Sequence, residues 1–146
     1  MVIKESEARM KLKLQLVQDG KILFDMPLSI TDWSKEELES EFQATEGEFA
    51  KFSKLFDALS HETRLRMMRR LIEDENRTMS FADFMRDMDL NPKTVWENSK
   101  KLEESGLLKK TGRGKYICSD FGQTTFIVMS LALHRLMQSL REMDEY

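Results

Sequence analysis

Residues 80–118 read SFADFMRDMDLNPKTVWENSKKLEESGLLKKTGRGKYIC, and local signals divide the first part of this stretch into two helices. Ser80, with an acidic residue three positions later, has the spacing of a capping box and opens a short helix. Asn91 is a typical N-cap, and Pro92 suits the first helical position because its missing N–H would have no partner there. The sequence therefore predicts a short helix followed by a longer one over about 91–105.

A two-stranded hairpin is predicted directly after the longer helix. Gly106 is the residue type that commonly ends a helix in a left-handed conformation. Two short β-forming runs then flank the basic, glycine-rich tip 111–114. We therefore expect a β-hairpin over about 108–118 with positive charge at its tip.

Further helices are predicted before this stretch. Ser34, with a glutamate three residues later, begins a second capping-box pattern, and apolar residues then recur at close to helical spacing up to Leu59. Gly47 is expected to divide this region into two helices. Ser60 is expected to cap the next helix, which ends near residues 76–78.

The first 30 residues alternate between apolar and polar side chains, which is typical of β-strands. Asp19-Gly20 separates two such runs and tolerates the positive φ of a tight hairpin turn. The alternating apolar residues are Met10, Leu12, Leu14 and Leu16 before the turn and Ile22, Phe24, Met26, Leu28 and Ile30 after it. A lone hairpin is marginally stable in water, so we expect this one to pack on the dimer or to receive a partner or an effector.

The last helix is expected to begin at Asp120 and to carry an apolar seam. The seam residues, spaced three and four apart, are Phe126, Met129, Leu133, Leu136, Leu140 and Met143. This is the rhythm of helices that wrap around a partner, so the seam predicts a dimer interface with a second copy of the chain. A helix packed wholly within one protomer is the alternative.

Three short segments resemble the ArsR-like family of transcriptional regulators. Residues 56–67, FDALSHETRLRM, resemble the opening of the family's conserved helical region. Residues 102–108, LEESGLL, resemble the end of the recognition helix and the first strand of the wing. Residues 119–122, SDFG, resemble the turn into the final helix, and the resemblance as a whole covers roughly residues 49–142.

This resemblance implies a mainly α fold with small β elements, namely a winged helix-turn-helix. It implies a winged domain, which with its leading helices covers 34–120, and a C-terminal dimerisation helix at 121–146. The hairpin extension at 1–33 is predicted from its alternating residues and is not part of the family's core motif. The resemblance further implies a homodimer that binds double-stranded DNA and regulates transcription, most often as a repressor. The cysteine pairs with which the best-known relatives sense metals are absent.

The resemblance places DNA-contacting residues on the recognition helix (91–105) and the wing (108–118). The N-terminal part of such a helix presents side chains to base edges, while cations of the wing contact phosphates. The expected contact residues are Asn91, Lys93, Thr94, Trp96, Asn98, Lys100, Lys101, Lys109, Arg113 and Lys115. Asn98 is able to form a bidentate contact with adenine, and a solvated position on the helix is the alternative.

Three residues of the recognition helix depart from the family pattern. Glu97 occupies a usually basic position and would repel phosphate unless it accepts a hydrogen bond from a cytosine amino group. Ser99 stands where a core leucine is usual, so the helix is expected to pack differently. Trp96 is large for a position that faces the groove, and we favour a buried ring over a wedge against the DNA.

The charges along the chain are segregated. The 146 residues include 23 basic and 26 acidic ones, which gives a net charge of −3. Residues 31–62 carry a net −6, from nine acidic residues and three lysines, whereas residues 91–117 carry +4, from seven basic and three acidic residues. The second segment is the local basic surface that a nucleic acid would meet.

The sequence contains no clear signal of an enzyme, a metal site or a membrane segment. Its single cysteine, Cys118, and its two histidines, His61 and His134, form neither a nucleophile–base set nor a zinc site. The apolar runs are far shorter than the roughly 20 residues that span a membrane, and no secretory signal is visible. We therefore expect a cytoplasmic, non-enzymatic protein without a cofactor. The chain has eleven methionines, and those of the second and third helices are expected to fill gaps in the core.

Two alternatives to a DNA-binding regulator remain open at this stage. The acidic segment and Glu97 favour a winged-helix module that binds another protein and has little affinity for DNA. The methionines of the second and third helices allow a regulator that binds a small-molecule effector in a methionine-lined pocket.

Overall fold

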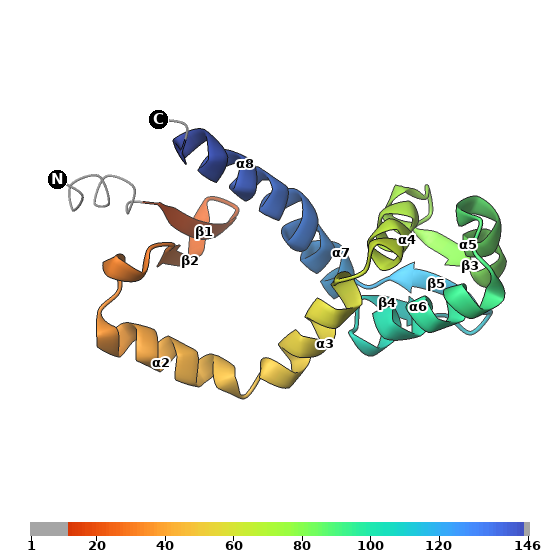
Figure 1. Cartoon of the computed structure of the whole chain (residues 1–146), viewed down its shortest axis with the longest axis horizontal. Helices are drawn as coiled ribbons and strands as arrows, with labels where there is room; N and C mark the ends of the chain where they lie inside the picture. The colour runs from red at the N-terminus through yellow and green to blue at the C-terminus, as the bar shows by residue number, and fades with distance from the viewer. Residues whose placement is uncertain (1–11, 145–146) are drawn as a thin grey trace. The chain divides into compact units, whose positions relative to one another are not determined.

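The computed structural model describes residues 12–144, and within them the protein is mainly helical with two small antiparallel sheets, as predicted. The chain divides into two compact units, the first ending at Phe49 and the second beginning at Ala50 (Figure 1). Met10, the first apolar residue of the predicted N-terminal alternation, lies outside the described residues.

The first unit contains the predicted N-terminal hairpin. Strands β1 (Lys13–Gln18) and β2 (Lys21–Pro27) pair antiparallel around Asp19-Gly20, whose φ angles are +49° and +80°. Asp and Gly are the residue types that tolerate this backbone conformation, so the turn is fixed locally by the sequence.

A bulge in this hairpin changes which side chains share a face. Leu16 pairs with Phe24, but the next residue, Val17, pairs with Ile22, so Leu23 has no partner across the strands. The predicted alternation, which placed Ile22 on the same face as Phe24, is therefore wrong at this point. Apolar side chains lie on both faces of the sheet, and these five residues are between 46% and 52% exposed.

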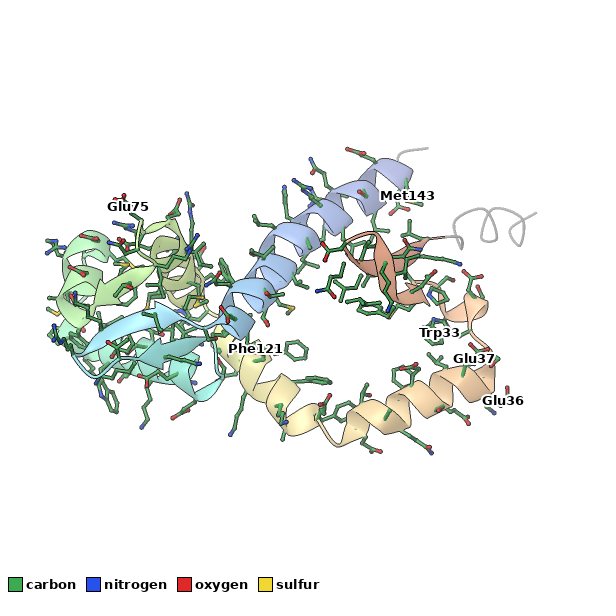
Figure 2. The ribbon with its side chains drawn as sticks, turned by 180° about the vertical axis from the view of Figure 1, so that it is seen from behind. Trp33, Glu36, Glu37, Glu75, Phe121 and Met143 are labelled. Carbon is green, nitrogen blue, oxygen red and sulfur yellow. The ribbon has the colours of Figure 1, made fainter. Side chains whose placement is uncertain are left out.

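After the hairpin, the first unit continues with a 3-10 turn and a helix. The turn η1 (Ile30–Asp32) is followed by α2 (Lys35–Glu46), whose N-cap Ser34 accepts a hydrogen bond from the backbone N–H of Glu37. Glu36 and Glu37 lie at the start of the helix (Figure 2), where negative charge stabilises the helix dipole. The helix ends at Gly47, which confirms the predicted division of this region.

The second unit contains most of the helices and a three-stranded sheet (Figure 1). Its elements are α3 (Phe49–Leu59), α4 (Glu62–Glu73), β3 (Thr78–Ser80), α5 (Phe81–Met88), α6 (Pro92–Glu104), β4 (Leu108–Lys110), β5 (Lys115–Cys118), α7 (Asp120–Ile127), the π-helical segment η2 (Val128–Ala132) and α8 (Leu133–Asp144). The predicted helices and the second hairpin are confirmed.

Strand β3 was not predicted. It pairs antiparallel with β5, with Thr78 opposite Ile117 and Ser80 opposite Lys115, and the sheet order is β3-β5-β4. A strand of three residues carries almost no periodic signal in a sequence. Its pairing joins strand β5 of the hairpin to the connection between α4 and α5.

The helix ends mostly follow the predicted capping. Ser80 and Asp83 form the complete capping box of α5, and the side-chain oxygen of Asn91 accepts from the N–H of Thr94 at 2.8 Å. Ser60 does not cap α4: its hydroxyl donates to the carbonyl of Asp57, and the N-cap is His61. The Nδ1 atom of His61 accepts from a backbone N–H of the first turn, so this histidine has a structural role.

The core of the second unit lies between α4, α5, α6 and the sheet. Met67, Met68 and Met79 are at most 2% exposed, which confirms that these methionines fill the core. The ring of Phe84 packs against Tyr116 of β5, with centroids 6.0 Å apart. Other buried apolar residues are Ala58, Leu71, Val95, Leu102, Leu107, Leu108 and Cys118.

A buried arginine ties three helices together. Arg64 of α4 is 6% exposed and donates to the carbonyls of Ala58 (2.7 Å) and Asp57 (2.9 Å), near the C-terminal end of α3. It also donates to the side-chain oxygen of Asn98 on α6, at 2.8 Å. The guanidinium therefore satisfies carbonyls of the last turn of α3, where intrahelical partners run out, and links them to α6.

The final helix starts against the end of α6. The Ser119 hydroxyl donates to the carbonyl of Gly106 at 2.7 Å and accepts from the N–H of Gly122 at 2.8 Å. A Cβ atom at Gly122 would lie 2.1 Å from the carbonyl oxygen of Leu107, which is backbone and cannot move aside easily. Only glycine fits this contact between α7 and the start of β4.

The π-helical segment η2 breaks the predicted seam of the last helix. The N–H of Leu133 bonds to the carbonyl of Val128, five residues back, so side chains after η2 are rotated relative to those before it. Phe126 packs against the core of its own unit, whereas Leu133, Leu136 and Leu140 are exposed. The prediction that Phe126 belongs to one continuous dimer seam is therefore wrong.

Replacing Arg64 by methionine should strongly destabilise the second unit. The carbonyl of Ala58 and the side-chain oxygen of Asn98 would lose the donor that Arg64 supplies, whereas the carbonyl of Asp57 would keep the Ser60 hydroxyl. We expect a loss of about 3 kcal/mol in the free energy of unfolding. Urea unfolding can be followed by Trp96 fluorescence in a Trp33→Phe background, because the chain has two tryptophans.

Arg66→Met is the matched control: Arg66 forms only an exposed ion pair with Glu62, so we expect a loss under about 0.5 kcal/mol. Equal losses in both variants would contradict the structural role of Arg64.

Candidate nucleic-acid interface

Helix α6 separates a buried side from an exposed side. Its buried residues are Val95, Asn98, Ser99 and Leu102. Its exposed residues include Lys93, Trp96, Glu97 and Lys100. Thr94 is half-buried, and Asn91 is exposed, with its side-chain oxygen engaged as the N-cap. Of the seven contact residues predicted on this helix, Asn98 is buried and Lys101 forms an ion pair with α3. The other five are Asn91, Lys93, Thr94, Trp96 and Lys100, and they lie outside the buried side.

Trp96 is exposed, so the prediction of a buried ring is wrong. Its side chain lies on the outer side of α6, and the residue is 54% exposed. The Nζ atom of Lys100, one turn later, lies 4.8 Å from the ring centroid in a cation–π contact. Val95 and Ser99 take the positions of this helix that face the core, which leaves the indole outside.

Asn98 is not available to read a base. The residue is 8% exposed, its amide donates to the carbonyl of Thr94 at 2.8 Å, and its oxygen accepts from Arg64 at 2.8 Å. The prediction that Asn98 contacts adenine is therefore wrong. Its side chain holds α6 against α4. Nothing in the sequence indicated this role, because Arg64 and Asn98 are 34 residues apart.

Ser99 explains how α6 packs without the usual leucine. The residue is 1% exposed, and its hydroxyl lies 3.2 Å from the carbonyl of Trp96 and 3.3 Å from the hydroxyl of Tyr116. A small residue at this position admits the large Tyr116 side chain from β5. The contact between Ser99 and Tyr116 joins β5 to α6.

Two lysines of α6 have acidic partners. Lys101 donates to the carboxylate of Asp57 at 2.9 Å and thereby connects α6 to α3. Lys93 lies 3.9 Å from Glu97 on the same helix. The helix carries three lysines and three glutamates, so its own net charge is zero.

The positive charge is concentrated on the β4–β5 hairpin. Its four cations are Lys109, Lys110, Arg113 and Lys115, and residues 108–118 contain no acidic residue. Among the residues that the structure describes, these four form no ion pair with a carboxylate. Lys110 was not among the predicted contact residues, although it precedes the tip directly. Its Nζ atom lies 6.0 Å from the Tyr116 ring centroid.

The remaining chemistry of the described region is sparse. No group of three His, Cys, Asp or Glu side chains between residues 12 and 144 could hold a metal ion. Cys118 is buried, as predicted, and burial raises the pKa of its thiol. None of the helices in that range is long and apolar enough to cross a membrane.

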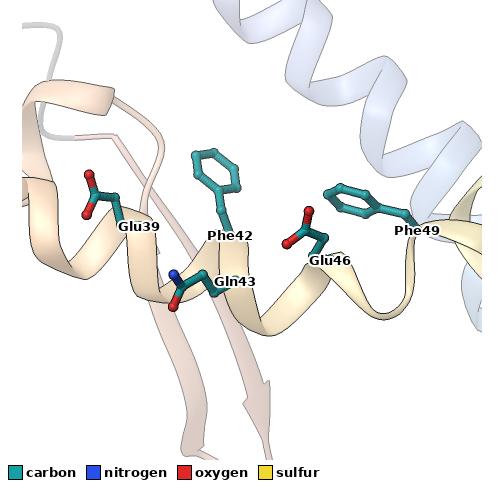
Figure 3. Close-up of a pocket in the computed structure, with 5 residues that line it drawn as sticks. All are labelled: Glu39, Phe42, Gln43, Glu46 and Phe49. Atoms are coloured by element: carbon teal, nitrogen blue, oxygen red, sulfur yellow. The ribbon is translucent and has the colours of Figure 1, made fainter.

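The first unit presents a second kind of surface, which is acidic and aromatic. A shallow cavity of about 330 Å³ runs along α2 (Figure 3). It is lined by Glu39, Phe42, Gln43, Glu46 and Phe49. Phe42 and Phe49 are 61% and 51% exposed, so this surface offers both apolar area and negative charge.

No protein-family model matches the chain, and neither does any curated protein. The resemblance to ArsR-like regulators therefore depends on the residues quoted above.

The ion pair between Lys101 and Asp57 should be visible in a pH titration. The hydrogen bond and the charge of Lys101 lower the pKa of Asp57 from its usual 3.8. Because the folded-state pKa is depressed, ionised Asp57 favours the folded state above pH 3.8, and this contribution disappears as the pH falls through the folded-state pKa. In Lys101→Met, carboxyl-detected NMR should find the Asp57 midpoint moved up toward 3.8.

Lys100→Met provides the control for this titration. Lys100 lies on the same helix, but it contacts Trp96 rather than Asp57. The Asp57 midpoint should therefore stay at its wild-type value. An unchanged midpoint in Lys101→Met would show that the ion pair does not form in solution.

Proposed function

We propose that this protein is a winged helix-turn-helix transcriptional regulator that binds double-stranded DNA as a homodimer. The observation that carries the proposal is the β4–β5 hairpin. It presents four cations and no carboxylate, and its strand β5 is held against α6 by the contact between Tyr116 and Ser99. A rigid cationic hairpin beside a helix is suited to contact DNA phosphates.

The helices before the hairpin support the same proposal. Short α5 and longer α6 are joined by a tight turn in which Asp89 has a φ of +52° and Asn91 begins the second helix. In a helix-turn-helix the second helix enters the major groove with its N-terminal residues at the bases. Lys93 and Trp96 are the exposed candidates for that position.

The charge distribution suggests how binding is divided between the two elements. Helix α6 is neutral overall, so the hairpin would supply most of the attraction to phosphates. Readout of bases would rest on a few side chains of α6. Glu97 could accept a hydrogen bond from a cytosine amino group, whereas at a phosphate it would be repelled.

The dimer is proposed to form through α8. Leu133, Leu136 and Leu140 follow each other at spacings of three and four and are between 37% and 43% exposed. A partner helix would remove this apolar row from water. Met129 in η2 and Met143 in α8 were also predicted for the interface, but both side chains are only partly exposed. A symmetric dimer would present two hairpins to one duplex and repress transcription by occupying a promoter.

Removing two cations from the hairpin should weaken DNA binding equally for all sequences. In Arg113→Ala/Lys115→Ala, anisotropy titrations with several labelled duplexes should find lower affinity throughout. The slope of log affinity against log salt should fall by about 1 for each phosphate that the variant no longer neutralises. Lys21→Ala/Lys35→Ala, which removes the same charge from the first unit, should leave the slope unchanged.

A flat salt dependence of the wild-type protein, or no binding at low salt, would reject the DNA-binding proposal. It would favour the second candidate, a module that binds another protein. The acidic and aromatic surface of the first unit is the observation that favours this candidate, since Phe42 and Phe49 are exposed and line one cavity with Glu39 and Glu46.

A charge on the α8 row should break the dimer. Light scattering of Leu136→Asp should give the mass of one chain at concentrations where the wild type is a dimer, because a buried carboxylate is costly without a partner. Leu131→Asp is the control, since Leu131 lies in η2 and outside the α8 row. A dimer that survives Leu136→Asp, or that is lost in Leu131→Asp, would place the interface elsewhere.

A further inference from the structure

A groove in the second unit remains unassigned by the proposed function. It lies between α4 on one side and α7 with η2 on the other, and its volume is about 520 Å³. Leu65 and Ile72 come from α4, and Phe126, Ile127 and Leu131 come from the opposite side. A volume of this size is typical of sites for small molecules, which occupy roughly 300 to 1,000 Å³.

The charged residues at this groove are already neutralised. Arg66 is 3.5 Å from Glu62, and Arg69 is 3.3 Å from Glu73, each pair within α4. The groove therefore offers no net charge to a ligand. The hydroxyl of Ser130, which also lines it, donates to the carbonyl of Phe126 within its own helix.

From this chemistry we propose that the groove binds an uncharged, largely apolar small molecule. An ionic ligand would have to compete with the two ion pairs of α4, and a strongly polar ligand would lose its hydration against aliphatic and aromatic side chains. An apolar ligand would remove these side chains from water while leaving the ion pairs at the rim solvated. The predicted effector pocket was lined by methionines, but those methionines fill the core instead.

The π-helical segment argues against a second copy of the chain as the occupant. Because η2 rotates the side chains that follow it, Leu133, Leu136 and Leu140 do not line the groove, and Phe126 does. The last helix thus has two separate apolar faces. A helix seated in the groove would have to desolvate the four charged side chains of α4, a cost that a small molecule avoids.

The probe for this site is N-phenyl-1-naphthylamine, an uncharged aromatic molecule whose fluorescence increases in apolar surroundings. It is titrated into the full-length protein without DNA, so the result does not depend on the proposed regulator function. We expect saturation at one probe per chain. Leu131→Gln should weaken binding about tenfold, because it places a polar group on the groove wall.

Val128→Gln is the matched control for the probe titration. Val128 and Leu131 lie in the same segment and are 53% and 61% exposed, but only Leu131 lines the groove. The control should bind the probe like the wild type, and circular dichroism should give both variants the wild-type helix content. Equal affinity in all three proteins, or no saturable binding, would overturn the proposal. Binding that begins only when the protein is diluted to monomers would overturn it too, since a second copy would then cover the groove.

Discussion

The guanidinium of Arg64 is the constraint on which the arrangement of α3, α4 and α6 depends. A buried cation is tolerated only where its donors are satisfied, and here two backbone carbonyls of α3 and the amide oxygen of Asn98 accept from it. Each acceptor is thereby fixed in direction as well as in distance. Two contacts fix the rotation of α6 about its own axis: the hydrogen bond between Arg64 and Asn98, and the contact between Ser99 and Tyr116. In this orientation the helix presents Trp96 and Lys100 to solvent.

Contacts of this kind also explain why the free positive charge of the second unit lies on the β4–β5 hairpin and not on α6. Residues of α6 that could have read bases are partly committed to packing, as Asn98 shows, or to ion pairs, as Lys101 shows. The β4–β5 hairpin has no such commitments to carboxylates among the described residues, and it carries the positive charge. Under the proposed function, this division makes affinity a property of the hairpin and leaves selectivity to the few exposed side chains of α6.

Features that depend on neighbouring residues were predictable from the sequence. The Asp19-Gly20 turn, the break at Gly47 and the caps at Ser80 and Asn91 each follow from the backbone preferences of one or two residues. Features that depend on distant partners were not. Strand β3 exists because β5 offers it an edge, and Asn98 is buried because Arg64 reaches it from another helix. For the candidate site, the sequence located the basic hairpin but not which side chains of α6 remain exposed.

The π-helical segment η2 has a consequence for how this protein can change over time. Deletion of a single residue between Val128 and Ala132 would convert the widened turn to ordinary α-helix and swing every later side chain by roughly a quarter of a revolution or more. Leu136 and Leu140 would then face a new direction without being altered themselves. During evolution, one deletion in η2 would therefore change which surface the apolar row of α8 contacts, while the elements before η2 kept their fold.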